Sequence, residues 1–298
     1  MTNEWDMRIA ESELIINSDG SVFHLHIRPE QLADKVILVG DPGRVETLAS
    51  YFDSIECRNA SREFVSFTGL CHGARITCLS TGIGTDNIDI VMNELDALAN
   101  IDFSTREVRS THRTLTILRI GTCGAVQPEI PLGAFVFSQY SVGTDGLMNW
   151  YADRDSITDR DMEQAFASHI HKTEYMAMPY VVGASPRLAG LFRDCAVMGI
   201  TVSAPGFYGP QGRVLRMGLA LPDMISDYES FRYGNLKVTN FEMESSAIAA
   251  MARHLGHDAG TVCCVIANRH LKSSNADYKD RVRELVGVSL DRMAGLSD

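Results

Sequence analysis

The chain has 298 residues, of which 45% are hydrophobic and 22% are charged, a composition typical of a globular protein with a sizeable core. Its net charge of −11 and its scattered Lys and Arg residues exclude a nucleic-acid partner, although a few arginines in one cleft can hold a small anion. No signal peptide and no apolar segment near the roughly 20 residues of a membrane span are recognisable. The sequence therefore predicts a cytoplasmic protein that does not bind membranes.

The seven cysteines are odd in number, and most lie inside apolar runs, as do Cys78, Cys263 and Cys264. This pattern predicts reduced thiols rather than a disulfide framework. Cys71 and His72 do not combine with Cys263 and Cys264 in a spacing typical of metal ligands, so the sequence predicts no metal site.

Strand-like apolar runs alternate with amphipathic helical segments along the chain. The expected strands are residues 36–40, 74–82, 114–121, 134–142, 180–184, 236–243 and 261–268, with a GTCGA turn at 121–125. The expected helices are residues 41–52, 87–99, 186–199, 245–256 and 276–293, the first with Asp41 as N-cap and Pro42 at its first position.

This alternation predicts a three-layer α/β/α fold around a central mixed sheet. The chain contains no repeat and no linker-like stretch, so we expect a single domain over residues 1–298, with residues 1–20 as an N-terminal extension. Residues 101–114 and 169–178 break the alternation and are expected to be insertions or exposed loops.

Five strand-like runs end in small, polar or charged residues, in the segments GDPGR, STGIGTD, RIGTCG, FEMES and ANR. In open α/β sheets the ligand crevice lies beyond the carboxyl ends of the strands. We therefore expect these five segments to meet at one site.

Two of the segments suit an anion. GDPGR places Gly40 and Arg44 at a helix N-terminus, where free N–H groups and the helix dipole favour negative charge, although a plain helix cap has the same pattern. RIGTCG places Arg119 inside an apolar strand, where it needs a carboxylate or phosphate partner. A phosphate site and a structural ion pair both remain open for Arg119. STGIG is not followed by a full GxGxxG, so no nicotinamide cofactor is expected.

The other motifs offer groups for a polar organic ligand. Glu242 and Glu244 stand two residues apart in FEMES and share a face if the backbone is extended. They suit an acid/base pair, a metal site, the hydroxyls of a sugar, or a solvated helix start. FYGPQGR presents Gln211 and Arg213, whose donors and acceptor match the edge of a planar amide such as uracil, although such a loop is also an ordinary turn.

The order of these motifs resembles that of the nucleoside phosphorylase family, in its uridine phosphorylase branch. The resemblance is carried, over about residues 22–269, by VFHLHI, GDPGRVE, SREF, STGIG, RIGTCGA, FYGPQGR, FEMES and ANR. RIGTxGA and EMES are typical of the whole family, whereas FYxxQxR followed by a late Asn-Arg is typical of the uridine branch. The resemblance implies reversible phosphorolysis of uridine to uracil and ribose 1-phosphate, in pyrimidine salvage, without a cofactor.

The resemblance also implies a role for each matched residue. The phosphate ligands would be Gly40, Arg44, Arg119 and Thr122, with Arg62 supplied to the neighbouring subunit. The ribose ligands would be Glu242, Met243 and Glu244, with His24 crossing to the neighbour's 5′-hydroxyl. The base would be bound by Phe207, Gln211 and Arg213, under a flap that carries Arg269. Catalysis would rest on Arg213, Gln211, Arg119 and Glu244, and a homodimer would be the minimal unit, which a hexamer would also contain.

The chain departs from the family pattern at several positions. Cys123 replaces the second threonine of RIGTTGA, and Gly209-Pro210 stands where Pro-Gly or Glu-Gly is expected. Some relatives bind potassium at the dimer interface; Glu63 and Ile83 match two of its ligands, but Asn87 replaces the serine, so a potassium ion at the interface stays open here. Three rival functions remain: a purine nucleoside phosphorylase, which usually has an Asp after the last strand, a nucleoside hydrolase, and a nucleoside-binding protein without catalysis.

Overall fold

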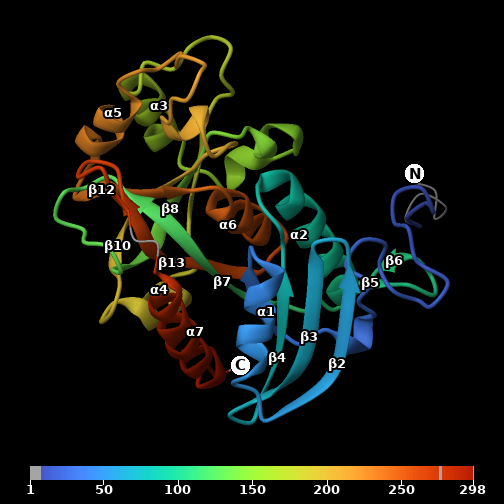
Figure 1. The fold of residues 1–298 in the computed structure, drawn as a ribbon. Helices are drawn as coiled ribbons and strands as arrows, with labels where there is room; N and C mark the ends of the chain where they lie inside the picture. Colours follow the sequence, from blue (N-terminus) through green and yellow to red (C-terminus); the bar gives the residue numbers. More distant parts are fainter. Residues whose placement is uncertain (1–7, 275–276, 298) are drawn as a thin grey trace, which may run out of the picture.

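Most of the strands form one large mixed sheet with helices on both faces (Figure 1). The computed structural model describes residues 8–274 and 277–297. The strand order is β11 (Arg232–Tyr233), β12 (Leu236–Glu242), β10 (Val197–Ser203), β8 (Phe135–Gly143), β13 (Asp258–Asn268), β7 (Thr116–Ala125), β1 (Lys35–Val39), β4 (Ala74–Ser80), β3 (Phe64–Cys71) and β2 (Ser54–Ser61). β14 (Ser273–Ser274) pairs with β13, and β9 (Tyr180–Gly183) pairs with β8.

Half of this sheet closes on itself. β12 pairs with β10 and also, antiparallel, with the end of β7, so that β7, β13, β8, β10 and β12 form a closed ring. The closing pairs are Asn240 with Ala125 and Phe241 with Gly124. A Cβ on Gly124 would lie 2.9 Å from the Phe241 ring, which explains why glycine stands there. The closure brings the RIGTCG and FEMES segments side by side.

The helices form two outer layers. α1 (Pro42–Ala49), α4 (Pro186–Phe192) and α7 (Lys279–Ala294) cover one face of the sheet, and α2 (Thr85–Asn100) and α6 (Ser245–His254) cover the other. Within β1, Val36 and Leu38 pack with the α2–α6 core, while Ile37 and Val39 pack with the α1–α7 core. This period of two on a strand buried on both faces confirms the predicted three-layer α/β/α fold.

The remaining helices cover one end of the sheet. α3 (Arg160–His169) and α5 (Met224–Ser230) pack with β8, β9, β10 and β12 in a further apolar cluster. Short 3₁₀ helices occupy Pro29–Gln31, Leu147–Trp150, Arg154–Ser156 and Gly209–Gln211. None of the described helices is long and apolar enough to cross a membrane. All seven cysteines are free, and five of them are buried, as predicted.

Several predicted boundaries are wrong. The GTCGA segment is not a turn, because β13 pairs with it (Cys264 with Thr122) and keeps β7 extended as far as Ala125. The helix predicted over residues 186–199 ends at Phe192, since Val197–Ser203 is a parallel strand between β8 and β12. The hairpin β2–β3 and helix α3 were not predicted. The closing helix begins at Lys279, and its predicted start, Ala276, lies outside the described residues.

One predicted insertion holds part of the N-terminal extension. Within residues 101–114, β5 (Ile101–Asp102) and β6 (Glu107–Val108) form a small separate hairpin. The buried Arg106 between them donates from Nε to Ile9 O over 2.9 Å and from Nη2 to Ala10 O over 3.1 Å. The described start of the chain and this hairpin therefore lie together at one side of the molecule (Figure 1).

Candidate active site

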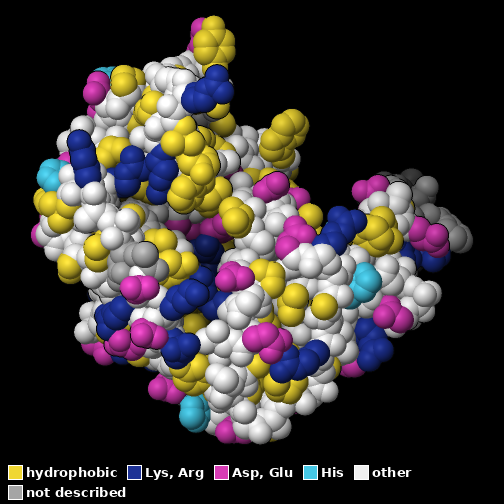
Figure 2. Space-filling view, in the orientation of Figure 1, with side chains coloured by type: hydrophobic (Ala, Val, Ile, Leu, Met, Phe, Trp, Pro, Cys, Tyr) yellow, Lys and Arg dark blue, Asp and Glu magenta, His cyan; other side chains and the backbone are white. Residues whose placement is uncertain are grey.

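All five predicted segments meet in one cavity of about 1040 Å³ at the carboxyl ends of the strands. Lys and Arg side chains gather around the hollow near the middle of the face shown in Figure 2. The basic residues that line the cavity are Arg44, Arg119, Arg213, Arg269 and Lys272. Among the predicted site residues, Gly40, Thr122, Phe207, Gln211, Glu242, Met243 and Glu244 line it as well. The convergence expected from the strand ends is confirmed.

Arg44 provides a cation at the start of α1. Asp41 caps this helix, because its Oδ1 accepts from Gly43 N over 2.9 Å. The Arg44 guanidinium donates to Ile120 O over 3.3 Å, and no carboxylate of the described chain lies within ion-pair distance of it. Burial, and then the neighbouring Arg119, lower its pKa. An unpaired cation at a helix N-terminus suits an anionic ligand.

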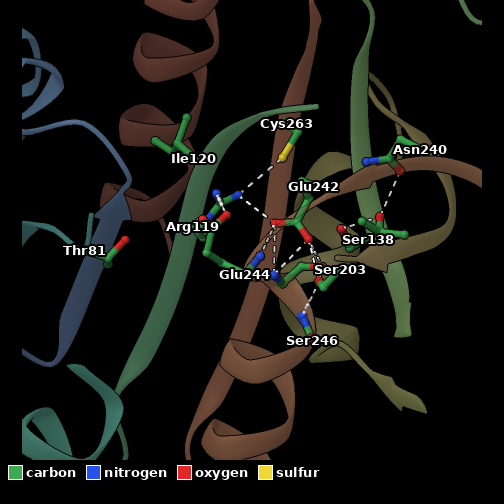
Figure 3. A network of polar contacts seen from close by, with 12 residues as sticks. Thr81, Arg119, Ile120, Ser138, Ser203, Asn240, Glu242, Glu244, Ser246 and Cys263 are labelled. Atoms are coloured by element: carbon green, nitrogen blue, oxygen red, sulfur yellow. Dashed lines mark hydrogen bonds and ion pairs between the residues drawn. The ribbon is translucent and has the colours of Figure 1, made fainter. Parts of the chain in front are cut away.

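Arg119 forms a buried ion network with the two glutamates of FEMES (Figure 3). Its Nη1 lies 3.1 Å from Glu242 Oε2, and its Nη2 pairs with Glu244 Oε2. Burial alone lowers the pKa of Arg119, but Glu244 and Glu242 together outweigh it and raise the pKa. The structural ion pair that the sequence left open is therefore present. The Nε of Arg119 is buried and has no hydrogen-bond partner in the described chain.

The Glu244 carboxylate accepts fewer hydrogen bonds from the protein than the Glu242 carboxylate does. Its Oε1 accepts from Gly84 N over 2.8 Å, and its Oε2 pairs with Arg119. Gly84 adopts a φ of +95°, a left-handed conformation that glycine tolerates. Burial raises the pKa of Glu244, Glu242 adds to the rise, and Arg119 opposes it. Each oxygen keeps acceptor capacity for a hydroxyl of a ligand.

A loop after β10 forms another part of the cavity. The Arg213 guanidinium stacks 3.7 Å from the centre of the Phe207 ring and donates from Nη1 to Phe207 O and to Gln211 Oε1. Arg269 donates to Gln211 O over 2.9 Å and to Gly212 O over 3.0 Å. Burial, and then Arg269, lower the pKa of Arg213 to about 10. No carboxylate of the described chain pairs with either arginine, so both can face carbonyl oxygens.

Two predicted site residues do not line this cavity. Arg62 is exposed at the turn between β2 and β3, with a φ of +53°. His24 lies near that turn, and its Nδ1 lies 2.6 Å from Glu94 Oε1. Their proposed service to a neighbouring subunit stays a prediction. The potassium site at the interface also stays open; there, Asn87 Nδ2 donates to Glu63 Oε1 over 3.1 Å.

The sequence interpretation missed several cavity residues. Lys272, Ser273 and Ser274 line the cavity because β14 folds back antiparallel on β13 after ANR. Phe241 and Asp41 line it too, although both belong to quoted motifs. The signal that was available for Lys272 is its position three residues after Arg269, within the segment expected to form a flap.

A second polar cluster comprises Asp96, His112 and His257, close enough together to suggest a metal site. His257 Nδ1 accepts from Leu115 N over 3.1 Å, which places the ring proton on Nε2, 3.1 Å from Asp96 Oδ1. A protonated nitrogen cannot bind a metal, so hydrogen bonding explains this cluster. The prediction of a metal-free protein stays a prediction.

The fold and the site define an α/β/α protein with an anion-binding arginine, buried carboxylates for hydroxyl groups, and an Arg–Gln pair for a polar ring. Comparisons with known proteins support this class. The Phosphorylase superfamily matches residues 34–296. The uridine phosphorylase of Haemophilus influenzae is 32% identical over 252 residues, which are 83% of this chain and 86% of that protein. A DeoD-type purine nucleoside phosphorylase of Geobacillus sp. is 29% identical over 273 residues, 90% of this chain and 96% of that protein.

A solved structure is similar over nearly the whole chain. It is a Trypanosoma brucei nucleoside phosphorylase that shows uridine phosphorylase activity, with a TM-score of 0.87 and 28% identity. The similarity covers 95% of this chain and 100% of the trypanosomal chain. The chain belongs to the Phosphorylase superfamily, and the family resemblance inferred from its motifs is confirmed.

Proposed function

We propose that the chain is a uridine phosphorylase, which splits uridine with phosphate into uracil and ribose 1-phosphate and also catalyses the reverse reaction. The observation that carries this proposal is the pairing of Gln211 and Arg213 in the cavity that also holds Arg44 and Glu244. The names of the Haemophilus and trypanosomal relatives support the same activity.

Phosphate binds at the start of α1. Arg44 has no carboxylate partner in the described chain and supplies charge-assisted hydrogen bonds. Thr122 and the backbone at Gly40 add donors, since both line the cavity. A Cβ on Gly40 would lie 3.3 Å from Gly82 O, so the glycine permits the close approach of two strand ends. Arg119 also lines the cavity and adds positive charge near this site.

The ribose lies against Met243 and Glu244. The Glu244 carboxylate accepts from the secondary hydroxyls of the sugar, because its oxygens keep lone pairs after binding Gly84 N and Arg119. Phosphate attacks the anomeric carbon while the bond to the base breaks, so the sugar develops oxocarbenium character and no covalent enzyme intermediate is required. Holding phosphate and sugar together lowers the barrier by fixing their orientation.

The base binds to Gln211 and Arg213, with Phe207 packed beside it. The run of carbonyl, N–H and carbonyl in uracil needs a donor, an acceptor and a donor, which an amide and a guanidinium provide together. Negative charge grows on the base as it leaves. Arg213 stabilises this charge more in the transition state than in the ground state, which accelerates the reaction.

A purine substrate is the nearest alternative, supported by the Geobacillus relative. Purine enzymes of the family usually have an Asp after the last strand, where this chain has Asn268 and Arg269. The buried Asn268 amide donates to Gln127 O over 3.0 Å and to Ile130 O over 2.9 Å, and its Oδ1 accepts from Leu271 N. The Asn268 side chain is therefore fully used in hydrogen bonds to the backbone, and it has no carboxylate to offer a purine ring.

The deciding experiment measures free base released from uridine and from inosine, each with and without phosphate. Uracil release that depends on phosphate is the expected result. Release of uracil without phosphate identifies a nucleoside hydrolase, and faster release of hypoxanthine from inosine identifies a purine enzyme. Binding of uridine without any release identifies a nucleoside-binding protein.

The proposal includes a homodimer as the minimal active unit. Arg62 and His24 are absent from the cavity of their own chain. The exposed hydrophobic side chain of Phe23 packs beside His24 and suits a contact with a second copy. A two-fold dimer then places each Arg62 in the other subunit's phosphate site. A single domain, a cytoplasmic location and the absence of a cofactor belong to the same proposal.

A further inference from the structure

Ser203, at the end of β10, belongs to none of the family motifs and does not line the cavity. It is fully buried, with 0% of its surface exposed. Its Oγ donates to Glu242 Oε1 over 2.6 Å and accepts from Ser246 N over 2.9 Å (Figure 3). Ser203 thereby connects β10 to the carboxylate that binds Arg119.

The Glu242 carboxylate is saturated by donors from the protein. Its Oε1 accepts from Ser203 Oγ over 2.6 Å, and from Ser245 Oγ over 2.8 Å and Ser245 N over 3.0 Å. Its Oε2 accepts from Glu244 N over 3.0 Å and pairs with Arg119 Nη1 over 3.1 Å. A carboxylate has about four acceptor sites, and this side chain is only 2% exposed. No lone pair is left for a sugar hydroxyl.

These contacts also fix the start of α6. The carboxylate accepts from the N–H groups of Glu244 and Ser245, the first of the helix's free donors. The same carboxylate binds Arg119, and Arg119 binds the Glu244 side chain. The position of Glu244 is thus set twice, through its backbone by Glu242 and through its carboxylate by Arg119.

We propose that Ser203 and Glu242 form a positioning pair that holds Arg119 and Glu244 in their working geometry, and that Glu242 is not itself a ribose ligand. The proposal rests on the proposed function, because it takes Glu244 as the residue that binds the sugar. It replaces the ribose-binding role expected for Glu242. Ser203 does not line the cavity, so it acts through Glu242 and through the start of α6, where it accepts from Ser246 N.

The test compares Ser203→Ala, Ser203→Thr and Ser138→Ala. Ser138 is a matched control, because it is also buried, with 2% exposed, and its Oγ lies 2.7 Å from Thr201 Oγ1 without contacting Glu242. A misplacement of about 1 Å at reacting groups typically costs about 100-fold in rate, so we expect Ser203→Ala to lower kcat/KM by about 10- to 100-fold. Ser203→Thr keeps the hydroxyl and should retain most of the activity, and Ser138→Ala should leave kcat unchanged.

A double-mutant cycle separates positioning from general destabilisation. In an Arg119→Lys background, Ser203→Ala should lower kcat/KM by less than about twofold further, because the geometry that it maintains is already lost. Equal effects of Ser203→Ala in both backgrounds, or a loss of kcat in Ser138→Ala as large as in Ser203→Ala, overturns the proposal. If Ser203→Ala does not fold, Ser203→Cys supplies the cycle, since its thiol is only a weak donor.

The cycle is measured with whichever nucleoside the wild-type enzyme cleaves. A wild-type enzyme that does not cleave uridine refutes the proposed function alone. The ratio between backgrounds still decides the role of Ser203 in that case.

Discussion

The cavity has two halves that are built differently. The sugar half lies on β7 and at the end of β12, where Arg119, Glu242 and Glu244 are at most 6% exposed and joined by ion pairs. The base half lies on a loop, where the Phe207 side chain is 50% exposed and Arg213 rests on its ring. Arg269 attaches this loop to the end of β13 through two backbone carbonyls.

The two halves therefore have different tasks: the buried half serves the reaction, and the half on the loop selects the base. The charged groups of the sugar half are on or directly after strands that are paired on both edges, which fixes their positions. Groups that choose the base are on a loop, which can change length and sequence without disturbing the sheet. The following predictions test this division, in order of decreasing effect.

The largest expected effect concerns the base itself. Cytosine has an amino group where uracil has the carbonyl that faces Arg213, so donor meets donor and a partly buried charge loses its partner. Sites built on such hydrogen bonds reject the mismatched analogue by roughly 10⁴-fold. We expect kcat/KM for cytidine to be lower than for uridine by about this factor, measured by release of free base. Cleavage of cytidine within tenfold of uridine contradicts the assignment of the loop.

The second prediction contrasts the two halves directly. Arg213→Leu should lower kcat/KM for uridine by about 10²- to 10³-fold, the usual cost of removing a donor that stabilises transition-state charge. Its free energy of unfolding should change by only about 0.5 kcal/mol, since no carboxylate of the described chain depends on this arginine. Arg119→Leu leaves Glu242 and Glu244 buried without a cation, so it should lower the free energy of unfolding by about 3–5 kcal/mol. Urea denaturation measures both, and equal destabilisation refutes the division.

The third prediction concerns phosphate. Hydrogen bonds to charged groups contribute about 1.5–3 kcal/mol, so Arg44→Ala should raise the KM for phosphate by roughly 10- to 100-fold and the KM for uridine much less. Arg58→Ala is the control, because Arg58 forms an exposed ion pair with Glu46 outside the cavity. Steady-state kinetics with each substrate varied provide the comparison. An unchanged KM for phosphate in Arg44→Ala removes this residue from the phosphate site.

The smallest expected effect is a partial recovery of activity. Arg62→Ala and Arg44→Ala subunits are separately impaired, but a mixed dimer contains one site with both arginines intact. Random mixing should therefore restore about a quarter of the wild-type sites in a two-fold dimer. Arg44 is preferable to Arg119 here, because Arg119→Ala would disrupt the buried ion network. No recovery after mixing, verified by mass spectrometry, indicates that Arg62 does not serve a neighbouring site.

The strand-end motifs could be predicted because they depend on local rules. An Asp-Pro pair begins a helix wherever it follows a strand, and the structure has Asp41 as the N-cap of α1. Tails such as GDPGR and ANR meet because the carboxyl ends of parallel strands face the same edge of a sheet. The same local rules gave a wrong prediction for the GTCGA segment. Its glycines favour a turn locally, and only pairing with β12 and β13 keeps it extended.

The sequence by itself determined the α/β/α class, the convergence of the five segments and the family of the chain, because alternating apolar runs and short motifs are local in the chain. Only the tertiary structure decided what each charged group binds. Glu242 and Glu244 are alike in sequence, yet the first is saturated by Ser203, Ser245 and Arg119 and the second keeps free lone pairs. Ser203 is 39 residues from Glu242 in the chain and reaches it through the parallel pairing of β10 with β12, a contact that no local pattern encodes.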